Sequence, residues 1–378
     1  MFRNSMKKIL FSATTFVAVI SLVLAACGDD NDSESASSAE KPLIVVTTNI
    51  LGDVVTNMVG DSFDVETIMP PGSDPHDFQA SAKQVQTMMS ADLLVVNGAN
   101  FEEGMLDVIE NAESDGVMIF EAVSVVSQLE GSDDHGDHGG HDDHGGHDDH
   151  EGHDDHGEEK DHDDHEGHDD HDEEKDHDDH EGHDDHEGHD DHGEEKGHDH
   201  GGIDPHFFTD PARMAVFAQE LSEVLAANFP NADQGFVSTT NDYVQQLQDL
   251  DSEVEEILSV VSSGKRLLVT NHAVFAYFAD RYSFTVLGEI IPSSSTLASA
   301  SAQQLASIAE KVDENQVKAI FADASSSDAL AQILADEVDG VEVINLFTES
   351  LGDPGAAGDS YIDMVRFNAE AIASALVE

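Results

Sequence analysis

Short runs of β-branched and apolar residues alternate with amphipathic segments along most of the chain. In the first half, the runs of strand length lie at 43–48, 63–69, 93–97 and 117–120. Helical spacing of apolar residues lies between them, near 50–59, 81–90 and 101–112. The alternation resumes with strand-length runs at 266–270, 284–287, 318–322 and 342–347, and a closing helix near 359–376. This order predicts an α/β fold of two lobes, each a mainly parallel four-stranded sheet flanked by helices.

A longer amphipathic segment lies between the two series of strands. Residues 231–261 contain no Gly or Pro apart from Gly235, and their apolar positions recur at helical spacing. The segment predicts one helix of about 28 residues and about 42 Å, long enough to join both lobes as a stiff strut. Two ordinary helices broken near Asp251 are the alternative. The predicted boundaries are an N-terminal lobe at 43–230, a linking helix at 231–262 and a C-terminal lobe at 263–378.

The segment 131–202 differs in composition from both lobes, because it consists almost wholly of Asp, Glu, His and Gly. A 15-residue unit begins at His147 and again at His162 and His177. A segment without apolar side chains cannot form a core, so we expect a disordered loop inserted in the N-terminal lobe. Its histidines recur as His-X-X-His and predict weak, auxiliary binding of zinc, copper or nickel, with a solvated acidic spacer as the alternative. The histidines in the repeats are His147, His150, His153, His156, His162, His165, His168, His171, His177, His180, His183 and His186.

The start of the chain has the pattern of a secretory signal. Basic residues precede an apolar run at 9–26, and residues 24–27, Leu-Ala-Ala-Cys, resemble the lipobox of bacterial lipoproteins. The resemblance implies a signal peptide at 1–26 and a lipid on Cys27, which would hold the protein on the extracytoplasmic face of the cell membrane. An uncleaved anchor is the alternative, although the run is barely long enough to span a bilayer. The polar residues that follow predict a flexible tether at 27–42.

Charge and cysteine usage narrow the possible partners. A formal net charge of −66 at pH 7 excludes a nucleic-acid partner, which would need a basic face, and favours a cation. Cys27 is the only cysteine, so no intramolecular disulfide can form.

Three histidines outside the segment 131–202 occupy positions suited to a metal site. His76 and His272 each follow a predicted strand, and ligands in open α/β sheets bind beyond the carboxyl ends of strands. His206 stands in the tripeptide Asp-Pro-His, as His76 does. Asp74 and Asp204 are each expected either to orient the following imidazole or only to form a turn or helix cap.

Glu349 is the candidate for a fourth ligand, because it lies two residues beyond the last predicted strand of the C-terminal lobe. An acid at the start of a helix is the alternative reading of this residue. Three imidazoles and one carboxylate suit tetrahedral zinc, whereas manganese favours more oxygen.

In combination these motifs resemble the cluster A-I solute-binding proteins of zinc and manganese ABC transporters. The resemblance covers residues from about 43 to 376. Its motifs are Gly-Ser-Asp-Pro-His at 72–76, Asp-Pro-His at 204–206, Thr-Asn-His-Ala at 270–273, Leu-Phe-Thr-Glu-Ser at 346–350 and Gly-Asp-Ser-Tyr at 358–361.

The resemblance implies four ligand positions, at His76, His206, His272 and Glu349. It also implies two lobes joined by a rigid long helix, with metal held between them and little hinge closure. His272 at the third position, together with a His-rich loop, is typical of the zinc receptors. Many relatives have Asp at the fourth position, so either Glu349 or water completes the site.

The predicted function is therefore a high-affinity zinc receptor that delivers Zn²⁺ to the permease and ATPase of an ABC uptake transporter. We expect a monomer without enzymatic activity that releases metal below about pH 6, where imidazoles become protonated. A manganese receptor of the same family and a metal-sequestering surface adhesin are the alternatives. A zinc hydrolase is disfavoured, because the chain has no His-Glu-X-X-His helix and no evident general base beside the ligands.

Overall fold

The computed structural model describes residues 41–131 and 202–377. The predicted signal peptide, Cys27, most of the predicted tether and the histidine repeats lie outside these residues. None of the helices within the described ranges combines the length and the apolar content needed to cross a bilayer.

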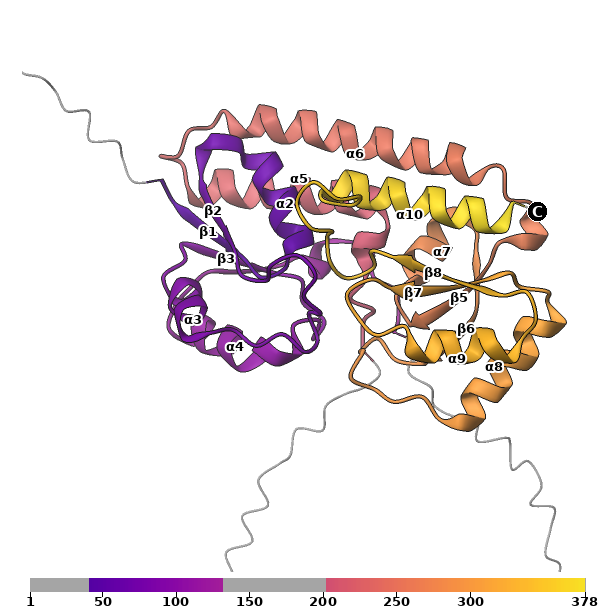
Figure 1. Cartoon of the computed structure of the whole chain (residues 1–378). Helices are drawn as coiled ribbons and strands as arrows, with labels where there is room; N and C mark the ends of the chain where they lie inside the picture. The colour runs from indigo at the N-terminus through magenta and orange to yellow at the C-terminus, as the bar shows by residue number, and fades with distance from the viewer. Residues whose placement is uncertain (1–40, 132–201, 378) are drawn as a thin grey trace, which may run out of the picture.

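The N-terminal lobe is a four-stranded parallel sheet with helices on both faces (Figure 1). The strands run in the order β2-β1-β3-β4. They are β1 (Leu43–Val46), β2 (Asp64–Thr67), β3 (Leu93–Val96) and β4 (Ile119–Glu121). The helices of this lobe are α2 (Asn49–Val59), α3 (Ala82–Met89), α4 (Leu106–Ser114) and α5 (Pro211–Asn228).

The C-terminal lobe repeats the arrangement with the strand order β6-β5-β7-β8, again wholly parallel. Its strands are β5 (Leu267–His272), β6 (Thr285–Ile291), β7 (Ala319–Asp323) and β8 (Glu342–Leu346). Its helices are α7 (Ala276–Tyr282), α8 (Ala302–Glu314), α9 (Ala329–Glu337) and α10 (Tyr361–Leu376). The prediction of two α/β lobes with four-stranded parallel sheets is confirmed.

Local signals in the sequence start several of these helices. Ser81 and Ser301 each form a capping box with a glutamine three positions later, which satisfies backbone N–H groups that a first turn leaves free. Asp210 caps α5 ahead of Pro211, whose fixed φ suits the first helical position. Ser360 caps α10 in the same way.

Alternate residues of each central strand enter different cores. In β1, Ile44 and Val46 face a large core that both lobes share, while Val45 faces a smaller core under α3 and α4. In β7, Phe321 faces the shared core and Ile320 faces a core under α8 and α9. Burial on both faces explains why the strands appear in the sequence as continuous apolar runs rather than as alternating ones.

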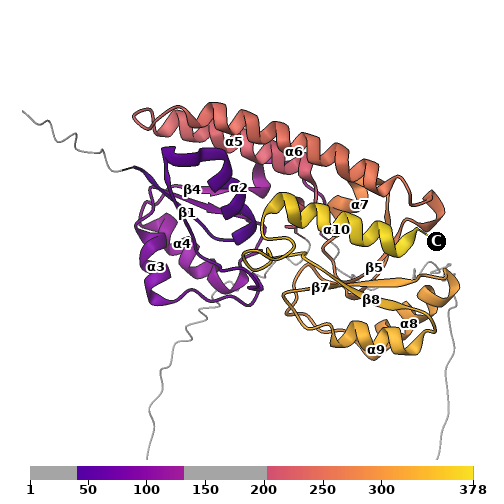
Figure 2. The same cartoon turned by 45° about the horizontal axis from the view of Figure 1, so that its top comes forward.

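One long helix, α6 (Phe236–Leu258), lies across both lobes (Figures 1 and 2). It contacts α2, α5 and α10, and these helices contribute to the shared core. The helix continues unbroken through Asp251, so the alternative of two helices is wrong. It begins later than predicted because Asp233 accepts a hydrogen bond from the backbone N–H of Gly235 at 3.0 Å, which stabilises a turn ahead of the first helical residue.

Two strand ends differ from those predicted at the site. β5 continues past residue 270 because its pairing with β6 extends to His272 and Ile291. β8 ends at Leu346, so Glu349 lies three positions beyond the strand, in the loop toward α10.

Candidate metal centre

His76, His206, His272 and Glu349 come together in one buried cluster. His76 lies in the turn after β2, His206 lies just before the 3-10 turn that leads to α5, His272 ends β5, and Glu349 follows β8. Their side chains are nearly inaccessible, between 0% and 2% exposed. The two lobes therefore contribute two candidate ligands each. His272 ends a parallel strand and Glu349 lies three positions past one, where open α/β sheets bind ligands, and His76 lies in the longer loop that follows β2.

The geometry of the cluster fits a single small cation. One carboxylate oxygen, Glu349 Oε1, lies 2.9 Å from His76 Nε2, 3.3 Å from His206 Nε2 and 2.9 Å from His272 Nε2. One ligand atom from each of the four side chains lies within 4.8 Å of all the others. Tetrahedral zinc with bonds of about 2.0–2.1 Å needs ligand atoms about 3.3 Å apart, so the more widely spaced atoms would have to move closer together around the ion.

Asp204 orients the imidazole of His206. Its Oδ1 accepts a hydrogen bond from His206 Nδ1 at 2.8 Å and another from the His206 backbone N–H, also at 2.8 Å. The Nδ1 hydrogen bond places the proton on Nδ1, which leaves Nε2 free to donate its lone pair to a metal. The prediction that this aspartate orients its histidine is confirmed.

Asp74 does not orient His76, although it stands in the same tripeptide. Asp74 Oδ1 accepts from the His76 backbone N–H at 2.9 Å, and its Oδ2 accepts from Thr296 Oγ1 at 2.8 Å. The ring of His76 instead contacts Glu103, whose Oε1 lies 3.1 Å from Nδ1. Asp74 is thus a turn residue that also joins the two lobes, and Glu103 supplies the carboxylate partner of the ring.

Sequence reasoning missed both Glu103 and Asp323. Asp323 ends β7, is 2% exposed, and accepts hydrogen bonds from the backbone N–H and the hydroxyl of Thr348. It therefore holds the loop that carries Glu349. Its place at a strand end is the signal that could have revealed Asp323, whereas no sequence pattern pairs Glu103 with His76.

Burial and neighbouring charges shift the pKa values of Glu349, His76 and His206. Burial opposes ionisation of Glu349, yet His272 and His76 outweigh it and hold the pKa of Glu349 well below its usual range. Burial alone would lower the pKa of His76, but Glu349 and Glu103 raise it to about 10. For His206 the same opposition, burial against Asp204, ends with a raised pKa. The raised pKa of His76 means that a cation binding to its ring must displace a proton.

Two buried atoms of the cluster have no hydrogen-bond partner within the described part of the chain. They are Glu349 Oε2 and His272 Nδ1. A buried polar atom without a partner costs about 1–3 kcal/mol of folding free energy, and such atoms are uncommon in folded proteins. The unpartnered carboxylate oxygen fits a group whose remaining ligand capacity is met by a metal ion.

A hollow of about 110 Å³ leads from the surface to the cluster. Of the four candidate ligands, His76 lines it, together with Glu103, Asn100 and Ser295. Gly131 and Gly202, the described ends of the histidine-rich segment, also line it. The hollow therefore brings the surface nearest to the cluster on the side of His76.

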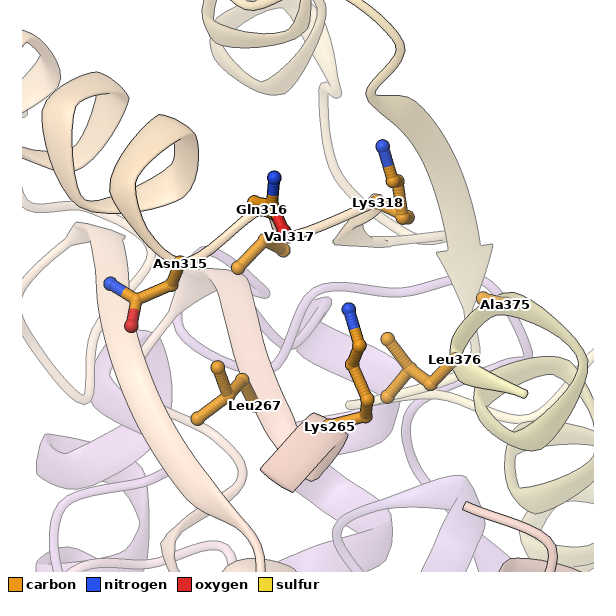
Figure 3. A pocket seen from close by; sticks show the side chains of 8 residues that line it. All are labelled: Lys265, Leu267, Asn315, Gln316, Val317, Lys318, Ala375 and Leu376. Carbon is orange, nitrogen blue, oxygen red and sulfur yellow. The ribbon is translucent and has the colours of Figure 1, made fainter. Parts of the chain in front are cut away.

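A second hollow lies at the opposite edge of the C-terminal sheet and has a different character (Figure 3). Lys265 and Lys318 precede β5 and β7, so this hollow lies at the amino ends of the strands. None of its lining side chains is an imidazole or a carboxylate. The residues that line it are Lys265, Leu267, Asn315, Gln316, Val317, Lys318, Ala375 and Leu376. This hollow therefore lacks the imidazole and carboxylate ligands of the buried cluster.

Two parallel α/β lobes, bridged by a long helix and enclosing four buried candidate metal ligands, define a two-lobe metal-binding solute-binding protein. The family model described as the periplasmic zinc-uptake complex component A, ZnuA, matches residues 44–375. The chain therefore belongs to this family, the substrate-binding proteins of zinc and manganese ABC transporters. Members of the family are receptors rather than enzymes.

Individual relatives are distant in sequence but align over most of the chain. The manganese ABC transporter substrate-binding lipoprotein PsaA of Streptococcus anginosus is 25% identical over 98% of this chain and 99% of its own length. The manganese-binding lipoprotein MntA of Halalkalibacterium halodurans is 22% identical, with 98% and 99% covered. Among solved structures, the periplasmic zinc-binding protein TroA from Treponema pallidum matches with a TM-score of 0.65 and 23% identity, over 89% of this chain and all of that one. This match supports the two-lobe fold.

Proposed function

We propose that this protein is a high-affinity zinc receptor that delivers Zn²⁺ to the permease and ATPase of an ABC uptake transporter. The observation that carries the proposal is the convergence of three imidazole Nε2 atoms on one carboxylate oxygen, within 2.9–3.3 Å. In this proposal His76, His206, His272 and Glu349 all bind the ion directly. Zinc is the cargo, and the protein carries out no chemical reaction on it.

The ligand set supports zinc over manganese. Three nitrogen ligands and one oxygen suit tetrahedral zinc, while manganese favours carboxylate, carbonyl and water oxygen. Relatives named for manganese, at 22–25% identity, support the alternative of a manganese receptor. We prefer zinc because the chemistry of the ligands decides which ion the site holds, and three of the four ligands here are imidazoles.

The architecture suits capture and release rather than catalysis. The cation reaches the cluster from the side of His76 and displaces the protons held there. The shared core and α6 tie the lobes together, which favours small changes in lobe spacing over a wide hinge motion. Because each lobe supplies two ligands, a small separation of the lobes on the transporter is enough to break the coordination.

The histidine-rich segment has a place in the same proposal. Its described ends, Gly131 and Gly202, line the hollow that leads to His76. We propose that the repeat histidines collect zinc weakly and raise its local concentration at this opening. A solvated acidic spacer would leave uptake at low zinc unchanged when the repeats are removed.

The proposed location is the extracytoplasmic face of the cell membrane. The signal-like start and the lipobox-like residues ahead of Cys27 support a cleaved, lipid-modified chain. Several relatives of full length are named lipoproteins, which agrees with this proposal. Metabolic labelling with a radioactive fatty acid tests it: label should enter the wild-type protein and not a Cys27→Ala variant.

Calorimetric titration of the purified protein with zinc and then with manganese tests the metal. We expect one tight zinc site that manganese does not displace. His272→Ala removes one of four ligands and should weaken zinc binding by about 100-fold or more, if about 10–16 kcal/mol of binding free energy is shared among four ligands. A tight site that prefers manganese would establish the alternative.

Cell growth separates a transport receptor from a sequestering adhesin. Cells that lack the gene should stop growing at a zinc-chelator concentration that wild-type cells tolerate, and wild-type protein should restore growth. An adhesin would bind zinc equally well in vitro, but its loss would leave uptake of radioactive zinc unchanged.

A further inference from the structure

The loop that carries Glu349 is held from the N-terminal lobe by Asn49, the first residue of α2. Asn49 Nδ2 donates to Ser350 Oγ at 2.9 Å, and Asn49 Oδ1 accepts from the backbone N–H of Leu351 at 2.8 Å. The same Nδ2 donates to the carbonyl oxygen of Pro70 at 3.0 Å. Asn49 is 6% exposed, so its bonds form out of competition with bulk water.

Ser350 receives a second hydrogen bond from the same lobe. The backbone N–H of Gly72 donates to Ser350 Oγ at 2.7 Å. Gly72 has a φ of +76° and stands in the turn that leads to His76. One hydroxyl, next in sequence to Glu349, is therefore bonded both to α2 and to the turn of another ligand.

The other side of the loop is anchored within its own lobe. Thr348 donates to Asp323 from its backbone N–H at 3.2 Å and from its hydroxyl. Asn368 on α10 holds the residue before it, since its Oδ1 accepts from the Phe347 backbone N–H at 3.0 Å and its Nδ2 donates to the Phe347 carbonyl at 2.7 Å. Glu349 thus lies between an anchor in the C-terminal lobe and one in the N-terminal lobe.

Glu349 has few other contacts that could set its position. The hydrogen-bond partners of its Oε1 are the three histidines, and its Oε2 has none within the described residues. A ligand held only by the cluster that it completes depends on its backbone for direction. That backbone is set by residues 347–348 on one side and 350–351 on the other.

We propose that Asn49 and Ser350 form an interlobe latch that positions Glu349 against the three histidines. The latch makes the fourth ligand sensitive to the spacing of the lobes: when the N-terminal lobe moves away, Asn49 and Gly72 release Ser350, and the carboxylate loses its alignment. The inference rests on the proposed function, because it requires the cluster to bind a metal ion. It adds two positioning residues that do not touch the ion.

Ser350→Ala tests the latch with the smallest change, because it removes only the hydroxyl. Zinc affinity, measured by competition with a chromophoric chelator, should fall by roughly 10-fold to 100-fold, as for other residues that orient metal ligands. The rate of zinc release to the chelator should rise. Thr240→Ala is the matched control: it also removes a buried hydroxyl that bonds a backbone atom, the Met58 carbonyl at 3.1 Å, but it lies outside the site and should leave zinc affinity unchanged.

A double-mutant cycle shows whether the latch acts through Glu349. In a Glu349→Gln background, Ser350→Ala should cause no further loss of affinity, and Asn49→Ala should behave in the same way. Equal losses in the wild-type and Glu349→Gln backgrounds would overturn the latch while leaving the zinc receptor intact. Unchanged affinity in Glu349→Gln would overturn it as well, since the latch would then position a group that is not a ligand.

Two further measurements distinguish a failure of the latch from a loss of folding or a failure of the proposed function. Thermal unfolding of the metal-free variants shows whether a loss of affinity comes with a loss of folded structure. If Ser350→Ala does not fold, the affinity of Asn49→Ala tests the latch in its place. If the wild-type protein itself bound neither zinc nor manganese, the proposed function would fail, and the latch with it.

Discussion

Asp204 Oδ1 bonds both the backbone N–H and the ring Nδ1 of His206, each at 2.8 Å, whereas Asp74 reaches only the backbone N–H of His76. The two aspartates stand in the same Asp-Pro-His sequence, but only Asp204 contacts the ring of the following histidine. Asp204→Asn should weaken zinc binding by roughly 10-fold to 100-fold, because an amide is a poorer acceptor for Nδ1–H and orients the ring less firmly.

Asp74→Asn is the matched control for that substitution. The ring of His76 is held by Glu103 rather than by Asp74. The loss of zinc affinity in Asp74→Asn should therefore be several-fold smaller than in Asp204→Asn. Competition titration against one chelator measures both. Equal losses would show that the turn, rather than the ring contact, governs the ligand.

Zinc binding should release protons at neutral pH and above. The pKa of His76 is raised to about 10 because Glu349 and Glu103 outweigh the effect of burial. The metal-free cluster therefore holds a proton at pH 7.5 that zinc must displace, and zinc affinity should fall steadily as pH falls from about 10. The onset of weakening lies above the value of about 6 that an ordinary imidazole pKa predicts.

Calorimetry in buffers of different ionisation enthalpy measures this release. The observed heat at pH 7.5 should vary with the buffer in proportion to at least one proton per zinc. Heats that do not depend on the buffer would mean that the imidazoles are already neutral.

The metal-free protein should show the opposite dependence on pH. A raised pKa means that the ion pair of His76 with Glu349 stabilises the fold fully below the ordinary imidazole pKa of about 6.5. This contribution is lost as pH rises through about 10. Thermal unfolding of the metal-free protein should therefore show a midpoint that declines from pH 7 to pH 10, and the decline should be smaller in Glu349→Gln.

His272→Glu should shift the metal preference toward manganese. The substitution exchanges one of three nitrogen ligands for oxygen, which manganese prefers and zinc does not require. We expect zinc affinity to fall by about 10-fold or more, since the shift in preference should cost about 1.4 kcal/mol or more, and manganese affinity to rise. His272→Ala should lower both, and a variant that lost both metals like His272→Ala would contradict the prediction.

Removal of residues 133–200 should spare the tight site. The described ends of this segment already lie side by side, since Glu130 pairs with Ile203 and the Gly131 N–H donates to the Gly202 carbonyl at 2.8 Å. A short connection can therefore close the chain without strain in either lobe. Zinc titration should retain one tight site and lose the weaker ones, and a lost tight site would assign the repeats a direct role in it.

Asp251 stabilises the long helix against α7. Its carboxylate accepts from Arg281 Nε at 2.8 Å and from the Tyr282 hydroxyl at 3.0 Å, and Asp251 is 8% exposed. Asp251→Ala should lower the free energy of unfolding by about 2–3 kcal/mol, because it leaves a buried hydroxyl and a partly exposed guanidinium unpaired. The exposed Asp249, on the same helix, gives the control: Asp249→Ala should change it by less than about 0.5 kcal/mol. Chemical denaturation measures both.

The three histidines could be predicted because each carries a local signal. His76 and His206 share a tripeptide, and His272 stands at a strand end in a fold whose sheets are readable from apolar runs. The spacing and the length of apolar runs suffice to locate the strands, since burial on both faces makes a parallel strand apolar throughout. Glu349 has a weaker signal and needed the resemblance to a family.

The strand ends at the site could not be predicted in detail. β5 extends to His272 because His272 pairs with Ile291 of β6. The local sequence does not show which residues of two strands will pair. The start of α6 was likewise set by the turn at Asp233 rather than by the apolar period.

The sequence by itself determined the two α/β lobes, the long helix between them, and the residue types that can bind metal, because these depend on periodicity and on local chemistry. The tertiary structure decided which groups contact and orient those candidate ligands. Glu103 partners His76, Asp323 holds the Glu349 loop, and Asn49 reaches Ser350, 301 positions away. Such contacts arise only when both lobes pack, because hydrogen bonds between distant residues depend on the relative placement of whole elements.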